Sequence, residues 1–426
     1  MPHLRVILVS LMLPTGAFAQ VPVSAGAQDQ AAAPAEPTPE PGSELRVWLL
    51  TAAPGEAVWE RFGHNAIRVL DTASGRDVAY NWGIFDFDQV DFVPRFLKGQ
   101  MLYMMAPFQA GPMVESYARA NREIVAQELD LTPSHRLAIR DFAERNALPQ
   151  NREYFYDYFL DNCSTRIRDL LDLALGGALS DRFGDEPTGT TWRFHTRRLT
   201  QIDPFLFTGM DLLLGRPGDE PISTWQEMFL PMTLRDAARV MTIVDDDGVS
   251  RPLVKSEEVV APSSREPEAG APTSWLPGYL VLGLLLGGLL ALSGYRAAAG
   301  SRPFLLMFGS IGTVWSLVAG LVGLILVLVL FTDHHFMVWN ENLFLLNPLS
   351  LALAVMVPFS TARARYRRAA KGLAMTLVGL GLVGLLVQLL PASTHQNELF
   401  FALVLPVHLG LALALHRLKL EEAPLL

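Results

Sequence analysis

Asp161-Asn162-Cys163-Ser164-Thr165 contains the single cysteine of this sequence and marks a change in local pattern. The residues before it, Tyr154-Phe155-Tyr156-Asp157-Tyr158-Phe159, are typical of a strand or extended chain. Asp161 and Asn162 are both suitable helix N-caps. The residues after it carry apolar side chains at the spacing of one helix face: Ile167, Leu170, Leu171 and Ala174. We therefore expect Cys163 to open a helix.

A lone cysteine cannot form an internal disulfide, so Cys163 is either a reactive thiol or a small buried apolar group. At a helix start, the free backbone N–H groups and the positive end of the helix dipole favour a thiolate. A structural cysteine in a core is the alternative. A histidine in a suitable context upstream favours the catalytic interpretation.

That histidine is His64, which follows Gly63 at or near the start of an expected strand over residues 66–70. Residues 77–83 form the next expected strand, and the turn at Ser74-Gly75 predicts that the two strands pair as a hairpin. A thiol nucleophile needs a base, and the base needs an orienting group. We assign His64 as the base and Asn81, in the second strand, as the orienting group. Asp86, just beyond that strand, is the second candidate for orienting or substrate positioning.

Backbone N–H groups at the start of the Cys163 helix are expected to hold an oxyanion, with the Asn162 side chain helping. Two further histidines lie in the same part of the chain. His135 lies at an expected helix start and is expected to be solvated, whereas His195 follows Trp192-Arg193-Phe194 and is the alternative base.

The formal net charge is −9, so the sequence has no basic footprint for nucleic acid. Arg5, the apolar stretch Val6 to Leu13 and Ala17-Phe18-Ala19 predict a secretory signal peptide at residues 1–19. Residues 20–43 are rich in Ala, Pro, Glu and Gln, which predicts a disordered linker. The soluble domain is then expected at residues 44–250.

The C-terminal third has the composition of a membrane domain. After a second expected linker at residues 251–274, five apolar stretches approach or exceed the roughly 20 residues that cross a bilayer as a helix. They lie at about 276–293, 304–331, 343–360, 373–390 and 398–415. Lys and Arg crowd the first and third connecting loops and the C-terminus, whereas the second and fourth loops have none. The positive-inside rule then places the soluble domain outside the cytoplasm and a cytoplasmic tail at residues 417–426, after a membrane domain at 275–416.

The second outer loop contains His334-His335 and the amides Asn340 and Asn342. Placing an amide at the entrance of a span costs free energy unless the amide has a hydrogen-bond partner or binds a ligand. These amides could therefore bind a lipid head group or a peptide amine. Ordinary interfacial residues that cap helices or bond to one another are the alternative. No third ligand accompanies the histidine pair by spacing, so we expect no metal site.

This order of motifs resembles the circularly permuted papain-like fold that lecithin:retinol acyltransferase and its relatives share. More specifically, the sequence resembles the Lnb-type lipoprotein N-acyltransferases, which are bacterial envelope proteins with a periplasmic thiol domain and a C-terminal membrane region. The resemblance covers about residues 44–416. Four motifs carry it: Phe62-Gly63-His64-Asn65-Ala66, Tyr80-Asn81-Trp82-Gly83-Ile84-Phe85-Asp86-Phe87, Asp161-Asn162-Cys163-Ser164-Thr165 and Asn340-Glu341-Asn342-Leu343.

The resemblance implies an α+β protein with a permuted papain-like periplasmic domain followed by an all-α bundle of about five transmembrane helices. It implies transfer of a fatty acyl chain from a phospholipid or lipoprotein donor, through a thioester on Cys163, to the N-terminal amine of a diacylglyceryl lipoprotein. The protein would then be a multi-pass component of the bacterial inner membrane. The chemistry requires no metal or cofactor.

The residues alone leave two other classes open. One is a membrane-tethered thiol hydrolase, either a peptidoglycan peptidase or amidase or a lipid hydrolase, with water as the acceptor. The other is a periplasmic binding or sensor domain, for which Cys163 would be dispensable. Five spans exceed what a tether needs, and this favours the acyltransferase over a cell-wall hydrolase.

Overall fold

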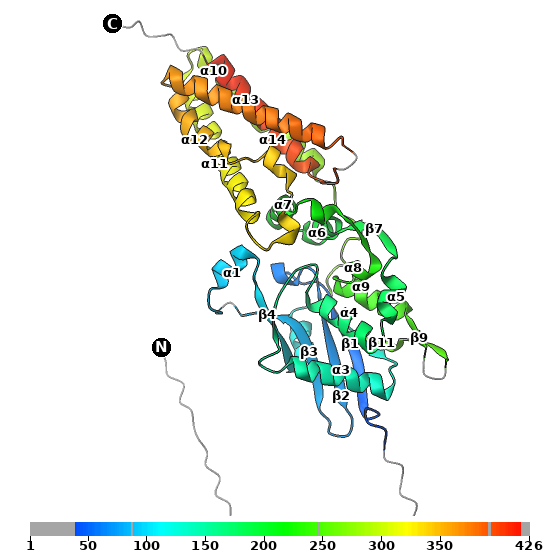
Figure 1. Ribbon diagram of the computed structural model, residues 1–426. Helices are drawn as coiled ribbons and strands as arrows, with labels where there is room; N and C mark the ends of the chain where they lie inside the picture. Colours follow the sequence, from blue (N-terminus) through cyan, green and yellow to red (C-terminus); the bar gives the residue numbers. More distant parts are fainter. Residues whose placement is uncertain (1–38, 87, 245–247, 391–392, 419–426) are drawn as a thin grey trace, which may run out of the picture. The chain divides into compact units, whose positions relative to one another are not determined.

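The computed structural model describes residues 39–86, 88–244, 248–390 and 393–418. The expected signal peptide, most of the first linker and nearly all of the expected tail lie outside the described residues. Within them, a sheet domain precedes a domain of long apolar helices, so the chain is an α+β protein as expected (Figure 1).

The central sheet has seven strands in the order β11-β5-β1-β2-β3-β4-β6, and each neighbouring pair is antiparallel. The predicted hairpin is confirmed, because β2 and β3 pair directly with Ala66 opposite Asn81. The hairpin places His64, the first residue of β2, near Asn81 in β3. The strands span Leu45–Ala52 (β1), His64–Asp71 (β2), Asp77–Ile84 (β3), Leu102–Gln109 (β4), Ile124–Leu129 (β5), Glu153–Phe155 (β6) and Val254–Ala261 (β11).

Strand alternation separates the two faces of this sheet. Val47 and Ile67 belong to the core cluster that contains Cys163, and this face packs against α3 (Pro133–Asn146), α4 (Cys163–Ala174) and α9 (Pro231–Val240). Trp48 belongs to a second cluster on the opposite face, which α2 (Ala110–Arg119) covers in part. Cys163 therefore lies on the face of the sheet that three helices cover.

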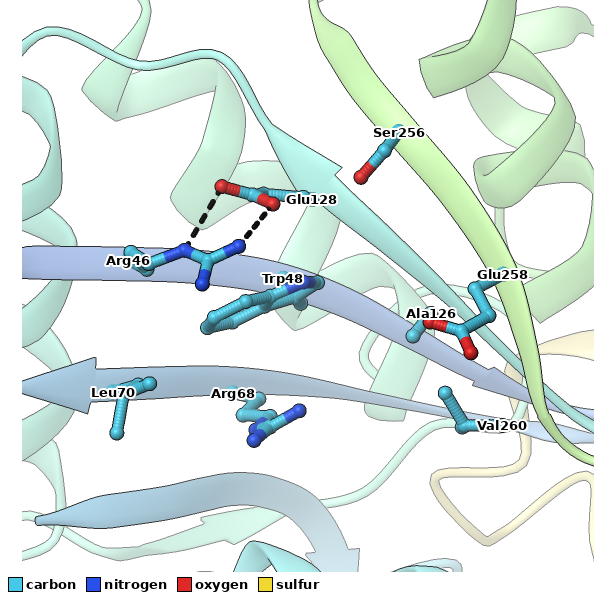
Figure 2. A pocket seen from close by; sticks show the side chains of 9 residues that line it. All are labelled: Arg46, Trp48, Arg68, Leu70, Ala126, Glu128, Ser256, Glu258 and Val260. Atoms are coloured by element: carbon cyan, nitrogen blue, oxygen red, sulfur yellow. Dashed lines mark hydrogen bonds and ion pairs between the residues drawn. The ribbon is translucent and has the colours of Figure 1, made fainter. Parts of the chain in front are cut away.

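The uncovered part of the opposite face forms a hollow of about 290 Å³ (Figure 2). The Arg46 and Arg68 guanidinium groups lie 4.7 and 4.6 Å from the Trp48 ring centre, and Arg46 donates to Glu128. Both arginines have carboxylate partners, because Arg68 donates to Asp77. This hollow thus lies on the face of the sheet opposite to the one that packs against Cys163.

One expectation is wrong in part. The linker expected at residues 251–274 includes β11, which pairs with β5 and places Val259 opposite Val125. Its exposed Glu and Ser side chains gave this edge strand the composition of a linker, although the backbone completes the sheet. The strands β9 (Thr242–Val244) and β10 (Ser250–Pro252) pair with each other just before it.

A helical segment between α4 and α9 connects the sheet to the membrane domain. Its Arg193 is fully buried and donates to Asp219 at 2.7 Å and to Asp211 at 2.9 Å. The segment comprises α5 (Ala178–Phe183), β7 (Pro187–Thr191), α6 (Trp192–Thr200), α7 (Pro204–Leu213), η2 (Arg216–Asp219), β8 (Pro221–Ser223) and α8 (Thr224–Glu227). Because the buried Arg193 cation is paired, it holds α6 against α7 and η2.

The described residues contain five helices long and apolar enough to cross a membrane, which confirms the predicted spans. Glycines allow some of these helices to touch. A Cβ on Gly410 would lie 2.0 Å from the Gly287 carbonyl oxygen, so α10 and α14 pack backbone to backbone. The spans are Leu276–Ala298 (α10), Arg302–Val329 (α11), Glu341–Ser360 (η4, Glu341–Phe344, followed by α12, Leu349–Ser360), Ala364–Val387 (α13) and Glu398–Arg417 (α14).

Candidate active site

Cys163 is the first residue of α4, as predicted, and its side chain lies in the core with 7 % exposure. Asn162 is the N-cap. Its Oδ1 accepts from the Ser164 N–H at 2.8 Å and from the Thr165 N–H at 2.9 Å. An N-cap of this kind typically stabilises a helix by about 1 kcal/mol. The cap therefore fixes the backbone on both sides of the thiol.

The rest of the Asn162 amide is also occupied. Its Nδ2 donates to the Tyr158 carbonyl and to the Phe229 carbonyl, each at 2.9 Å. No amide hydrogen is left to donate to a reacting oxygen. The expected oxyanion role therefore does not fit the Asn162 side chain, which positions Cys163 instead.

His64 and Asn81 come together as predicted, with 3.0 Å between His64 Nε2 and Asn81 Oδ1. The Asn81 Nδ2 donates to the Ala79 carbonyl at 3.0 Å, and this fixes which end of the amide faces the histidine. Asn81 Oδ1 must then accept from a proton on His64 Nε2. In this tautomer of the neutral ring, His64 Nδ1 keeps its lone pair and can act as a base.

The residue after His64 joins this pair to the thiol. Ser164 Oγ donates to Asn65 Oδ1 at 2.9 Å, which connects the first turn of α4 to β2. The backbone N–H of Asn65 also hydrogen-bonds to the Cys163 sulfur and favours its thiolate. The Asn65 and Ser164 side chains are fully buried, so they hold β2 and the start of α4 in one arrangement.

Gly83 lets β3 approach Cys163 closely. It has φ +86°, and a Cβ there would lie 3.3 Å from the Tyr156 ring and 3.4 Å from the Cys163 Cβ. The pairing of β3 with β4 shifts between Asn81 and Ile84, on either side of this glycine. Asn81-Trp82-Gly83 thus supplies both the orienting amide and the space for the thiol.

Burial keeps both reactive groups neutral. Burial raises the pKa of the Cys163 thiol to about 11, and the Asn65 N–H opposes this shift. Burial lowers the pKa of His64 to about 4, and the hydrogen bond to Asn81 opposes that shift. At neutral pH both the Cys163 thiol and the His64 imidazole are therefore uncharged. The arrangement suits general-base attack, in which the proton moves as the sulfur attacks.

Two residues near the site were not identified from the sequence. The Tyr117 ring, in α2, stacks on His64 with 6.3 Å between ring centres and 14° between planes. The Arg122 guanidinium lies 4.7 Å from the Tyr117 ring centre and donates to Glu60. Arg122 is only 5 % exposed, and its charge lowers the pKa of both His64 and Cys163. No local motif marks these two residues, because the sheet brings them to His64 from about 50 residues away.

The other sequence candidates lie elsewhere. Asp86 is exposed and accepts from the Asp88 N–H at 2.8 Å within its own loop, so Asn81 holds the orienting position. His195 is buried in α6, with its Nε2 2.7 Å from Glu227 and its Nδ1 accepting from Arg198. These contacts explain His195 as part of the connecting segment.

Asn340 and Asn342 join the two domains instead of lining a substrate site. Asn340 Nδ2 donates to the Leu212 carbonyl at 2.8 Å, and Asn342 Nδ2 donates to the same oxygen at 3.1 Å. Asn342 Oδ1 accepts from Asn397. The carbonyls at a helix C-terminus lack intrahelical partners, and here membrane-domain amides satisfy the end of α7. The substrate-positioning role expected for these two amides does not fit these contacts.

The same outer loop contacts the segment before Cys163. The Phe336 ring centre lies 4.5 Å from that of Phe159 and 5.3 Å from that of Trp192. Phe159 also packs on Phe229 at 5.3 Å, and the Phe229 carbonyl accepts from Asn162. A continuous set of contacts thus runs from the membrane domain to the residue that caps the Cys163 helix.

Comparison with known families gives two matches. The Lnb N-terminal periplasmic domain matches residues 41–198, which include His64, Asn81 and Cys163. The Lnb transmembrane domain matches residues 284–419. Comparisons with curated proteins and with solved structures give no match. With both domains present in order, a periplasmic sheet domain ahead of a membrane-spanning helical domain, the chain belongs to the Lnb family.

Proposed function

We propose that this protein is a lipoprotein N-acyltransferase of the bacterial inner membrane that works through a thioester on Cys163. The observation that carries the proposal is the position of Cys163 at a capped helix start packed against β2, the strand that begins with His64 of the His64–Asn81 pair. Membership of the Lnb family and the five apolar helices place this thiol in a protein that works at a bilayer.

The first half-reaction forms the thioester. His64 Nδ1 takes the thiol proton as the Cys163 sulfur attacks the ester carbonyl of a membrane lipid. The N–H groups of Cys163 and Asn65 hydrogen-bond to the sulfur before the attack, and they become the backbone donors for the oxyanion as the sulfur loses its negative charge. The Ser164 and Thr165 N–H groups stay bonded to Asn162. The tetrahedral intermediate collapses, the C–O bond breaks, and the leaving alkoxide takes the proton from His64.

The second half-reaction transfers the acyl chain. The N-terminal amine of a diacylglyceryl lipoprotein attacks the thioester carbonyl, and His64 accepts a proton from the amine. The C–S bond then breaks, and the proton returns to the sulfur. The product is an amide, which is more stable than the thioester, so the step runs forward without a cofactor.

A hydrolase with the same residues would pass the acyl group to water. The test is therefore product analysis with purified protein in lipid nanodiscs, an N-terminally free diacylglyceryl lipopeptide and phosphatidylethanolamine as donor. The proposal expects one acyl chain added to the lipopeptide amine, seen by intact mass, with Cys163→Ala as the inactive control. Release of free fatty acid without any acylated lipopeptide would contradict it and favour the lipid hydrolase.

A further inference from the structure

The short helix α1 (Phe92–Lys98) exposes an apolar surface. Val93 and Leu97, four residues apart and so on one helix face, are 61 and 63 % exposed. Val90, just before the helix, is 79 % exposed and Phe96 is 46 % exposed. None of the helix residues is fully buried. Large neighbouring apolar side chains that nothing covers usually mark a contact with a partner or a membrane.

Contacts with the membrane domain give the position of α1. The Asp333 N–H donates to the Lys98 carbonyl at 2.8 Å, and His334 Nε2 lies 3.0 Å from the Phe96 carbonyl. Gly99 has φ +75°, and a Cβ there would lie 2.9 Å from the Asp333 carbonyl carbon. The end of α1 therefore packs directly against the backbone of the outer loop.

That loop begins where a membrane span ends. The span α11 finishes at Val329, only four residues before Asp333, and Phe331 between them is 83 % exposed. Four residues cover at most about 14 Å, so α1 lies within the interfacial region of the bilayer. Its last turn also carries Arg95 and Lys98, which suit phosphate head groups beside an apolar face.

We propose that α1 is an interfacial membrane helix whose apolar face, Val93, Phe96 and Leu97, lies in the outer leaflet of the bilayer that holds the five spans. The occupant of this face is lipid, because the surface continues from the end of α11. The short helix by itself buries too little to anchor the protein, so the spans hold it at the interface.

The insertion also suggests an acyl route, and this part rests on the proposed function. The chain leaves α1 into β4, where the Tyr103 ring stacks on Tyr156 at 4.0 Å. Phe85 packs on Tyr103 at 5.1 Å, and Tyr156 contacts the Gly83 position beside Cys163. We infer that an acyl chain passes from the leaflet along these aromatic rings to the thiol.

Insertion is tested by a probe that does not depend on activity. Because Cys163 is the single cysteine, a Cys163→Ser background allows an NBD fluorophore on Leu97→Cys alone, in nanodiscs that contain phosphatidylcholine with doxyl-labelled acyl chains. The control is Val240→Cys, a 68 % exposed apolar position on α9. We expect the probe at 97 to be quenched at least threefold more than the probe at 240. Equal, weak quenching at both positions would overturn the insertion.

The route is tested with Val93→Glu/Leu97→Glu in the protein that retains Cys163. Acylation of Cys163 from bilayer phospholipid should fall at least tenfold, while acylation by the water-soluble ester p-nitrophenyl butyrate stays within twofold. Val240→Glu should change neither rate. An unchanged rate with phospholipid, or an equal loss with both donors, would overturn the route. Absence of any acyl-Cys163 in the wild-type protein would instead contradict the proposed function and leave the quenching result standing.

Discussion

Two histidines in this molecule have low pKa values and different roles. His64 in the sheet domain and His395 beside the membrane domain are both flanked by buried asparagines, and burial lowers their pKa values to about 4 and about 3. Both ring nitrogens of His395 bond to backbone, Nδ1 to the Glu341 N–H and Nε2 to the Leu214 carbonyl. Among the residues that the structure describes, His64 forms a ring hydrogen bond only through Nε2, to Asn81, and its Nδ1 retains a lone pair.

The difference shows that a low histidine pKa does not by itself indicate catalysis. The more informative feature is a ring nitrogen that makes no structural hydrogen bond and can therefore accept a proton. Around His395, the network joins two domains and every ring nitrogen is occupied. Around His64, the hydrogen bond to Asn81 holds the ring through Nε2 and leaves Nδ1 without a hydrogen-bond partner among the described residues. This contrast makes separate predictions for the two sites.

The largest expected effect is on His64. His64→Ala should lower lipopeptide acylation by about 10³-fold, within the range for loss of a general base, while the thermal midpoint stays near that of wild type. The measurement is the initial rate together with a melting curve. A His64→Ala rate close to wild type would remove His64 as the base and return His195 to consideration.

His395→Ala should show the reverse pattern. It leaves the Leu214 carbonyl and the Glu341 N–H without their ring partner, which costs about 1–3 kcal/mol in unfolding free energy. Activity per folded molecule should fall by less than about threefold, because the ring holds the junction and not the thiol. A loss of activity as large as that of His64→Ala, with unchanged stability, would contradict the contrast.

Phe336→Ala should affect the thiol from the membrane side. Removing the ring opens a space beside Phe159 and Trp192 and loosens the contacts that lead to Asn162. A shift of about 1 Å in a nucleophile can cost about 10²-fold, so a loss of about tenfold in kcat with little change in KM is expected. Phe331→Ala, on the 83 % exposed neighbour in the same loop, is the matched control. Equal kinetic constants for both variants would contradict a role of the Phe336 ring in positioning Cys163.

The smallest expected effect concerns pH. The base works only when His64 is neutral, so activity should fall as pH drops through about 4. Arg122 holds the His64 pKa down, and Arg122→Gln should therefore move the acid limb of kcat/KM to higher pH by less than about one unit. Arg122→Lys keeps the charge and should leave the limb in place. An acid limb that stays fixed in Arg122→Gln would remove Arg122 from the electrostatics of the site.

The parts of the site that the sequence predicted are local. The start of α4 at Cys163 follows from a cap and an apolar helical spacing, and the nearness of His64 and Asn81 follows from one hairpin. The five spans follow from hydropathy and length, which need no tertiary information.

The parts that the sequence did not predict depend on distant partners. Tyr117 reaches His64 through the packing of α2 on the sheet, and no pattern in its own segment indicates this. The amides of Asn340 and Asn342 suggested a substrate rim, because the α7 carbonyls that they satisfy are more than 100 residues away. The edge strand β11 resembled a linker because its exposed side chains are charged.

The most direct test of the account is whether Cys163 carries the acyl group. Purified protein is incubated with phosphatidylethanolamine in nanodiscs without acceptor, and the chain is analysed by intact mass and by peptide mapping. We expect a single added acyl chain on the peptide that contains Cys163, which hydroxylamine at neutral pH removes, and which is absent from Cys163→Ser and His64→Ala. An acyl chain on another residue, or lipopeptide acylation by Cys163→Ser at the wild-type rate, would contradict the thioester mechanism.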